Sequence, residues 1–501
     1  STNTNMTITG LDNGKSYTFV VSAHNIAGAS TLSLGSNSVT PLATVPNPPT
    51  EIIATRGDGT ASISWNSPVG AWILENQYSV SGYTVITSPG GNISTTTAFG
   101  LNGKVIRDFG LADNSNSAFS DDVVREILLD ENGNIILVGH SGNDSDIDAS
   151  ITRLNENGVI DNTFGDEGQV VLDIGSLHNF NYAALVQNDG AIVTTGYSVY
   201  ESNLRPFVAK YTSEGVLNTS FAQGGIYTSS FSIDGSEASF AGIDIVQTQS
   251  DKLLVLVIQT DGDSCFVLKF NSDGSLDPTF GNSGISDLIR DSSCGSILLD
   301  SSGDIYMAGA LGNSAGTAPL AAVFKMDNQG SLDPSFGSAG VSTVEEGKFV
   351  WSELTDFVLH TNGQISAVGY SGQGPSSPET NDFLIMRVNS DGSIDTNFGV
   401  DGFVVSDFSN LKDKAMSVLT DNDGNLIVSG YVGNGTDRDM VIAKYSSSGV
   451  LDSSFGNSGI TVLDFGHGDD KVYSSAITDE GFLFAAGYVD NGVNDDYAVI
   501  R

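Results

Sequence analysis

Basic residues and cysteines are scarce in this chain, and each shortage excludes a class of function. The 501 residues hold 20 Lys and Arg against 60 Asp and Glu, a formal net charge of −40 at pH 7. A nucleic acid or an anionic membrane surface would be repelled, so neither is expected as a partner. Two cysteines cannot supply a disulfide framework. No apolar run reaches about 18 residues, so no membrane insertion is expected.

A repeated motif organises most of the chain. A Phe followed by Gly-x-x-Gly, or a near match, recurs about every 59 residues, at Phe99, Phe164, Phe221, Phe280, Phe336, Phe398 and Phe455. Each repeat holds four short runs rich in β-branched residues, which in the sixth copy read GFVVSDF, AMSVLT, NLIVSGY and DMVIAKY. Four-stranded units of this length are typical of β-propeller blades, so seven copies predict an all-β, seven-bladed propeller.

The two ends of the repeat region are incomplete in complementary ways. The first copy contributes a single strand at residues 103–109, and the last copy ends one strand short at residues 496–501. Seven complete blades therefore require this N-terminal strand to pair with the last three strands. Such pairing closes the ring and removes two exposed sheet edges.

The residues before Phe99 follow a different pattern. Apolar and polar side chains alternate over residues 6–11, 16–23, 60–65 and 83–87. Alternation with period two, in short runs separated by turn residues, predicts the strands of a β-sandwich.

Two families are similar to these two regions. Residues 99–501 resemble bacterial delta-60 repeat β-propeller proteins, through copies such as NSDGSIDTNFGVDG at 389–402. Residues 1–98 resemble fibronectin type III domains: Trp65 matches the core Trp of the second strand, and LDNGKSY at 11–17 matches the turn before the tyrosine corner. The resemblance implies extracellular proteins and says almost nothing about activity.

The fibronectin-like halves stand in reversed order. Residues 1–43 resemble the last three strands (E, F and G), residues 44–50 form a Pro-rich linker, and residues 51–98 resemble the first four strands (A, B, C and C′). Completion within one chain would need the segment 41–51 to be almost fully extended. We therefore expect completion by a neighbouring copy, head to tail. The expected donors are Ile8, Leu11, Tyr17, Phe19 and Val21, and the expected acceptors are Ile63, Trp65, Tyr83 and Val85.

These features predict a non-enzymatic extracellular or cell-surface protein. Its expected role is as a subunit or repeat unit of a bacterial surface filament or adhesin, with other copies as partners and the propeller displayed as decoration. The alternative is a glycan- or protein-binding propeller module of a secreted multidomain protein. The sequence contains no recognisable catalytic motif. An enzyme would require acidic and basic side chains that converge on the propeller axis from several blades.

Aspartate-rich turns are the candidates for metal binding, and no other cofactor is expected. Asp144, Asp146 and Asp148, and likewise Asp421 and Asp423, have the oxygen density that calcium prefers. Neither turn carries a complete calcium loop, so hydrated turns are the favoured interpretation and calcium remains the alternative.

Two further sets of residues have structural interpretations. Cys265 and Cys294 lie in consecutive repeats, and separate buried thiols are favoured over a disulfide. A basic residue ends one strand of every repeat, and some aspartates follow it by 20 positions, which favours cross-strand ion pairs over an anion-binding ring. The basic residues are Arg153, Lys210, Lys269, Lys325, Arg387, Lys444 and Arg501, and the aspartates are Asp173, Asp407 and Asp464.

Overall fold

The computed structural model divides the chain into two compact units, Ser1–Asn102 and Gly103–Arg501. It describes residues 121–501 except 143–145, 176–177, 202, 234–235, 313–317, 346, 373–380 and 410. Before residue 121 it describes residues 18, 24–25, 28–29, 36, 50–56, 61–66, 83–85, 94–96, 99–100 and 103–107. Strands and turns make up all of this described part, and it includes no helix with the length and hydropathy of a membrane span.

The first unit contributes three two-stranded antiparallel sheets to the described residues. They pair β1 (His24–Asn25) with β2 (Gly28–Ala29), β3 (Thr50–Arg56) with β4 (Ala61–Asn66), and β5 (Tyr83–Val85) with β6 (Ser94–Thr96). The expected acceptors lie on β4 and β5. The expected donors Ile8, Leu11, Tyr17, Phe19 and Val21 lie outside the described residues. Completion of the sandwich therefore stays a prediction.

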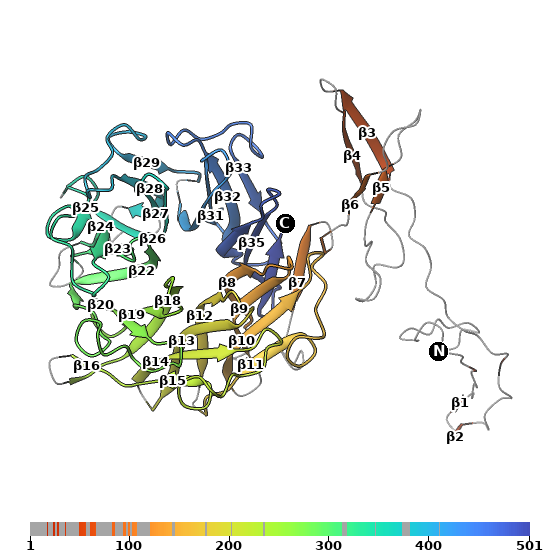
Figure 1. Ribbon diagram of the computed structural model, residues 1–501. Coiled ribbons are helices and arrows are strands. Elements are labelled where there is room, and N and C mark those ends of the chain that lie inside the picture. Colours follow the sequence, from red (N-terminus) through yellow and green to blue (C-terminus); the bar gives the residue numbers. More distant parts are fainter. Residues whose placement is uncertain are drawn as a thin grey trace. The chain divides into compact units, whose positions relative to one another are not determined.

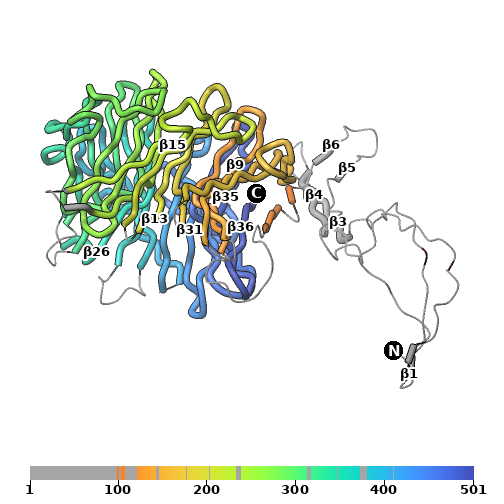
Figure 2. The backbone as a smooth tube through the Cα atoms, turned by 90° about the horizontal axis from the view of Figure 1, so that it is seen from below, coloured from red at the N-terminus to blue at the C-terminus, as the bar shows by residue number. Residues whose placement is uncertain are grey.

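The second unit is a ring of seven antiparallel sheets, each with four strands, around a central axis (Figures 1 and 2). Blade 1 is β8 (Val123–Leu129), β9 (Ile135–Gly142), β10 (Ile147–Leu154) and β11 (Gln169–Leu172). Blade 2 is β12 (Asn179–Val186), β13 (Ile192–Tyr200), β14 (Asn203–Tyr211) and β15 (Ile226–Thr228). Blade 3 is β18 (Phe240–Gln247), β19 (Leu253–Gln259), β20 (Ser264–Phe270) and β21 (Ile289–Arg290). The predicted all-β, seven-bladed propeller is confirmed.

The remaining blades repeat this order. Blade 4 is β22 (Ser292–Leu299), β23 (Ile305–Leu311), β24 (Leu320–Met326) and β25 (Val341–Thr343). Blade 5 is β26 (Trp351–Leu359), β27 (Ile365–Gly372), β28 (Asp382–Val388) and β29 (Phe403–Ser406). Blade 6 is β30 (Lys414–Thr420), β31 (Leu426–Gly433), β32 (Arg438–Tyr445) and β33 (Ile460–Leu463). A short hairpin of β16 (Ser232–Ile233) and β17 (Ser236–Glu237) lies between blades 2 and 3 in the sequence.

Blade 7 joins the two ends of the propeller sequence. It consists of β34 (Lys471–Ile477), β35 (Leu483–Asp490), β36 (Asp495–Ile500) and β7 (Lys104–Arg107). The last two pair antiparallel, with Val105 opposite Val499. In this sheet Val105 is buried whereas its neighbour Ile106 is 42% exposed.

The Phe-Gly motif has a structural role between blades. Phe280, for example, is buried among residues of blades 3 and 4. The next residue, Gly281, has a positive φ of 49°, and its N–H donates to the Gln329 carbonyl in a turn of blade 4. A Cβ at Gly281 would lie 1.9 Å from the Ile285 carbonyl oxygen, so only glycine fits there. Equivalent N–H groups donate to the next blade in the same way at Gly165, Ala222, Gly337 and Gly399. The motif therefore marks a contact that recurs between blades.

The cysteine prediction was wrong. Cys265 on β20 of blade 3 and Cys294 on β22 of blade 4 form a disulfide, with their Cα atoms 6.2 Å apart. The third strand of one blade packs on the innermost strand of the next, and their spacing along the sequence does not reveal this alignment. The bond is a covalent link between neighbouring blades.

The basic residues are structural, but their partners are not those expected. Arg153 pairs with Asp161 in the turn that follows its strand, at 2.8 Å, and the Arg153 guanidinium also lies over the Phe164 ring. Lys444 pairs with Asp421 at 2.8 Å. In both pairs the carboxylate lies in a turn of the same blade: Asp161 follows β10, and Asp421 lies between β30 and β31.

Candidate functional site

Each innermost strand carries a β-bulge at the same position. The register shifts by one residue in β8, β12, β18, β22, β26, β30 and β34. The extra residues are Arg125, Tyr182, Ile243, Gly295, Thr355, Met416 and Tyr473. A β-bulge changes the direction in which a side chain points. Each of these seven side chains is therefore oriented differently from the way it would be in a regular strand.

A glycine on the second strand makes room for each of six bulges. A Cβ at Gly487 would lie 1.8 Å from the Lys471 carbonyl oxygen, and one at Gly430 would lie 2.0 Å from that of Lys414. The residue after this glycine is aromatic in five blades, where it is His140, Tyr197, Tyr370, Tyr431 or Tyr488. The recurring Gly-Tyr pair was a sequence signal that the motif search missed.

Aromatic and charged side chains form a continuous series from blade 5 through blades 6, 7 and 1 to blade 2. We call this set the inner arc. Its members are Glu353, Tyr370, Lys414, Tyr431, Lys471, Tyr473, Tyr488, Arg125, Tyr182 and Tyr197. The corresponding positions of blade 3 are apolar, with Ala241 opposite Ile258 and Ile243 at the bulge.

In blades 5 and 6 the arc combines an acid, a phenol and a half-buried cation. The Tyr370 hydroxyl donates to Glu353 Oε2 at 2.5 Å, and Glu353 Oε1 accepts from the Ser293 hydroxyl at 3.1 Å. Lys414 Nζ lies 4.3 Å from the centre of the Tyr370 ring. Burial, and then the Glu353 charge, raises the pKa of Tyr370, whereas burial lowers the pKa of Lys414. The phenol therefore keeps its proton at neutral pH and acts as a hydrogen-bond donor.

In blades 7, 1 and 2 the arc holds cations against aromatic rings. Lys471 Nζ donates to the Tyr488 hydroxyl at 2.7 Å and pairs with Asp469 at 2.8 Å. The Arg125 guanidinium lies 4.3 Å from the Tyr473 ring centre and 5.2 Å from that of Tyr182. These rings belong to the two blades that flank Arg125, so three blades build one cationic and aromatic surface.

Two cations of the arc have no carboxylate partner in the part of the chain that the structure describes. Neither Arg125 nor Lys414 lies within ion-pair distance of an Asp or Glu there, although acids outnumber bases threefold in the sequence. Burial, and then the Arg125 charge, lowers the pKa of the neighbouring His140 to about 3, so this imidazole is neutral. The arc thus offers positive charge beside aromatic rings in an otherwise acidic protein.

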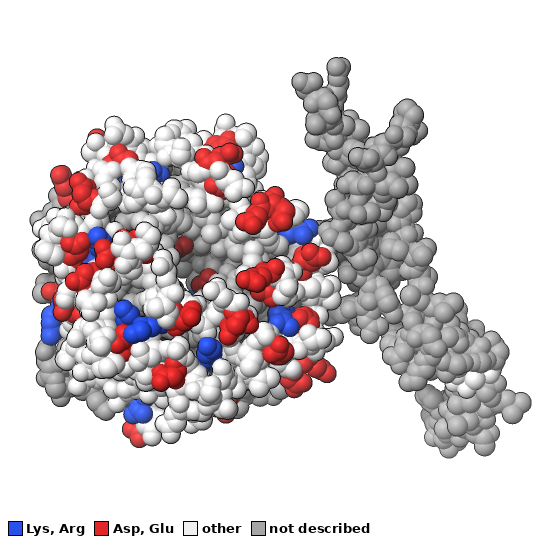
Figure 3. Space-filling model, in the orientation of Figure 1, with Lys and Arg blue, Asp and Glu red and all other residues white. Residues whose placement is uncertain are grey.

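Three half-buried acids follow the bulges of alternate blades. They are Glu126, Asp244 and Asp356; desolvation raises the pKa of each, and charge repulsion by Asp244 and Asp356 raises the pKa of Glu126 further. Asp244 Oδ2 accepts from the Ile297 N–H of the next blade at 2.7 Å, and Asp356 Oδ2 accepts from the Val418 N–H at 2.8 Å. These carboxyls link neighbouring innermost strands beside the axis. The propeller face in Figure 3 is hollowed at its centre, and acidic side chains are spread widely over it.

The aspartates predicted as calcium ligands lie in separate places. Asp421 accepts the backbone N–H groups of residues 423 and 425 within its turn and pairs with Lys444, while Asp423 lies exposed in the same turn. Asp148 is buried on β10, Asp146 precedes that strand, and Asp144 lies outside the described residues. Calcium binding at these positions stays a prediction.

One family matches parts of this sequence, and its description states only the fold. Five segments match the domain of unknown function DUF5122 β-propeller, at residues 131–164, 187–221, 249–280, 361–398 and 422–455. Each segment ends at the Phe of the repeated motif. No curated protein matches the chain.

Solved structures with a similar fold have unrelated sequences. The polysaccharide lyase Uly1 is 11% identical, with a TM-score of 0.45, over 78% of this chain and 93% of that chain. The α-L-arabinofuranosidase Arb93A of Fusarium graminearum is 11% identical, with a TM-score of 0.38, over 64% and 92%. Sqt1 from Chaetomium thermophilum is 11% identical, with a TM-score of 0.38, over 76% and 83%. At this identity the similarities concern the fold alone.

The prediction of a non-enzymatic protein is corrected by these findings. Propellers of similar fold include polysaccharide lyases and an arabinofuranosidase, which are enzymes. Acidic and basic side chains of several blades do lie on the innermost strands, with Glu353 in blade 5, Lys414 in blade 6, Lys471 in blade 7 and Arg125 in blade 1. Sequence motifs could not reveal this arrangement because each blade contributes only one or two of the groups.

Proposed function

We propose that the propeller binds an acidic carbohydrate through the inner arc. The observation that carries the proposal is the position of Arg125, held between the rings of Tyr473 and Tyr182 with no carboxylate partner among the described residues. Tyrosine faces pack on the apolar faces of sugar rings, and a guanidinium forms paired hydrogen bonds with a carboxylate or sulfate. Uronate-bearing or sulfated sugars present both features.

The distribution of charge further supports an anionic ligand. A protein with a formal charge of −40 repels anions at long range, so binding one requires local positive groups. Lys414, which has no carboxylate partner among the described residues, extends the positive groups into blade 6 beside Tyr370. The protonated hydroxyls of the arc add hydrogen-bond donors, because burial raises the pKa of Tyr197 and Tyr431 to about 12.

The full chain is expected to bind uronate oligosaccharides and not their neutral counterparts. Titration calorimetry with an oligoglucuronate should show saturable binding that Arg125→Gln or Tyr473→Ala weakens by about tenfold or more, which corresponds to about 1.4 kcal/mol. Lys348→Gln, a basic position outside the arc, should bind like the unmodified chain. New reducing ends in the same samples would reveal cleavage of the bound glycan.

Two results would count against the proposal. One is equal affinity for neutral and acidic oligosaccharides. The other is full affinity in both arc variants, with folding verified by circular dichroism.

We further propose that copies of the chain join head to tail through the first unit, as a surface filament or adhesin. The reversed order of its fibronectin-like halves supports this, as do the two-stranded sheets β3–β4 and β5–β6, because an isolated hairpin is marginally stable. The disulfide Cys265–Cys294 supports an extracellular location, since such bonds persist in oxidising compartments.

Removal of residues 1–43 is expected to leave a monomer, whereas the full chain forms polymers visible by electron microscopy and in sedimentation. Phe19→Asp should act like the truncation because the expected inward face would carry a charge. Thr18→Asp, at an exposed neighbouring position, is the matched control. Polymers that persist in the truncated chain would contradict head-to-tail completion.

A further inference from the structure

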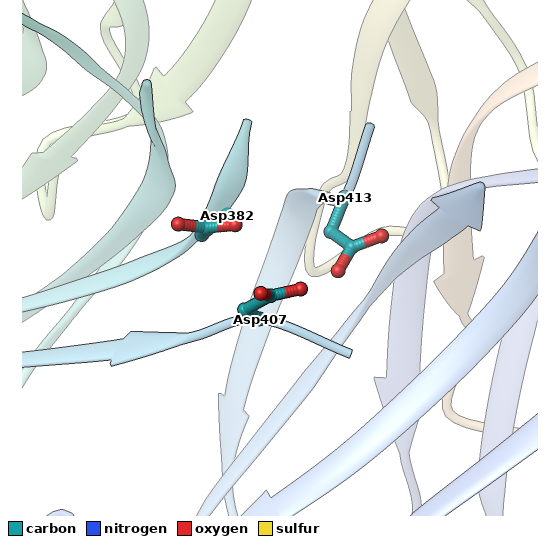
Figure 4. Close-up of side chains that lie close together, drawn as sticks. All are labelled: Asp382, Asp407 and Asp413. Carbon is teal, nitrogen blue, oxygen red and sulfur yellow. The ribbon is translucent and has the colours of Figure 1, made fainter. Parts of the chain in front are cut away.

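Two sets of three aspartates occupy equivalent places in consecutive blades. In each set one aspartate lies at the start of a third strand, one follows the fourth strand and one precedes the next innermost strand. The sets are Asp382, Asp407 and Asp413, and, 57 positions later in each case, Asp439, Asp464 and Asp470. Within each set, one carboxylate oxygen per residue lies within 4.8 Å of the others. Figure 4 shows the first set, with its three side chains turned toward a common space.

The backbone holds these carboxylates in place. Asp470 Oδ2 accepts from the Phe465 N–H at 2.8 Å, and Asp470 Oδ1 accepts from the Asp490 N–H at 3.2 Å. Asp464 Oδ1 accepts from the Gly466 N–H at 2.6 Å. Asp413 in the first set is bonded in the same way, with the Phe408 N–H on Oδ2 and the Gly433 N–H on Oδ1. The arrangement is thus built twice from equivalent backbone groups.

One oxygen of the second set is buried without any donor. Asp439 is 6% exposed, and its Oδ2 accepts from Asn434 Nδ2 at 3.1 Å. Its Oδ1 has no hydrogen-bond partner. No Lys or Arg of the described residues lies within ion-pair distance of Asp439, Asp464 or Asp470. The nearby Arg438 and Lys471 both pair with Asp469 instead. A buried carboxylate oxygen with neither donor nor counter-ion is unfavourable, and a proton or a bound cation relieves it.

We propose that Asp439, Asp464 and Asp470 bind a divalent cation of the calcium type at the junction of blades 6 and 7. Carboxylate oxygens are the ligands that Ca²⁺ prefers, and its irregular coordination accepts a site completed by water. Asp464 is exposed, so water reaches one side of the site while Asp439 and Asp470 close the other. Asp382, Asp407 and Asp413 would form an equivalent site at the junction of blades 5 and 6.

The proposed cation has a structural consequence. It would join the third and fourth strands of blade 6 to the start of β34, the innermost strand of blade 7. Burial, and then repulsion by Asp439 and Asp464, raises the pKa of Asp470 to about 6. A bound cation would reverse that repulsion. Ligand binding to the folded state alone raises stability, so Ca²⁺ should raise the melting temperature.

Calorimetry with CaCl₂ on the full chain, stripped of metal by a chelator, tests the site. We expect saturable binding and a rise in melting temperature that MgCl₂ at equal ionic strength does not reproduce. Asp464→Asn should lose one binding equivalent and part of the temperature rise, because an exposed side chain can change without refolding its surroundings. Asp479→Asn, an exposed turn residue outside both sets, controls for the change in net charge.

Each outcome of this experiment either supports the proposed cation site or contradicts it. Loss of one equivalent in Asp464→Asn but not in Asp479→Asn supports the site. Absence of saturable Ca²⁺ binding to the unmodified chain overturns it, and so does unchanged stoichiometry in Asp464→Asn. Oligosaccharide binding at the inner arc is a separate measurement and can succeed or fail independently.

Discussion

Val105→Asp is expected to destabilise the propeller by about 3–5 kcal/mol, the cost typical of placing an unpaired charge in a packed interior. Val105 is buried in β7, the strand that completes blade 7 by pairing with β36. Loss of this strand would leave β36 as an exposed edge and remove the pairing that joins the two ends of the propeller sequence. Urea unfolding followed by circular dichroism measures the change.

The adjacent residue in the same strand supplies a matched control. Ile106 is 42% exposed, so Ile106→Asp should change the free energy of unfolding by less than about 0.5 kcal/mol. Equal losses in the two variants would mean that β7 does not pack in the ring as described. Aggregation of Val105→Asp, read by light scattering, would accompany the freed edge of β36.

Acidification from pH 8 to pH 5 is expected to stabilise the propeller through the three acids that follow the bulges, Glu126, Asp244 and Asp356. Burial is the main cause that raises the pKa of Asp244 to about 7 and that of Asp356 to about 6, and burial also raises the pKa of Glu126. Between the unfolded value near 4 and these folded values, the folded state holds protons that the unfolded state has released. The free energy of unfolding therefore falls as pH rises through this window and levels off above about pH 7.

A single replacement isolates this effect. For Asp244 alone the change between pH 5 and pH 8 is on the order of 2–3 kcal/mol. Asp244→Asn removes the titrating group, so urea midpoints measured across that range should give a flatter profile even if the variant is less stable throughout. Asp479→Asn, in an exposed turn, should keep the original slope. A slope in Asp244→Asn as steep as in the unmodified chain would contradict the role of Asp244.

The blade count could be predicted because the same local contact recurs at five of the junctions between blades. Phe280 and Gly281 show the cause: a buried ring beside a backbone position that only glycine can occupy. A requirement within a few consecutive residues leaves a motif in the sequence. The Gly-Tyr pairs beside the bulges left a comparable trace, which would have located four of the ten members of the inner arc.

Groups that meet only across blades left no such trace. Cys265 and Cys294 are 29 positions apart on strands of different blades, and their pairing depends on how two sheets align. Arg125 contacts the ring of Tyr473, 348 positions later, because the ring of blades places blade 7 beside blade 1. Asp439, Asp464 and Asp470 come from three segments that converge only when blade 7 packs on blade 6.

Repetition of short packing motifs thus made the architecture predictable from the sequence alone, since each motif is a run of a few consecutive residues. The site was decided by tertiary structure. Its charges and rings are single residues contributed by separate blades, and only the circular arrangement of the sheets brings them to one surface.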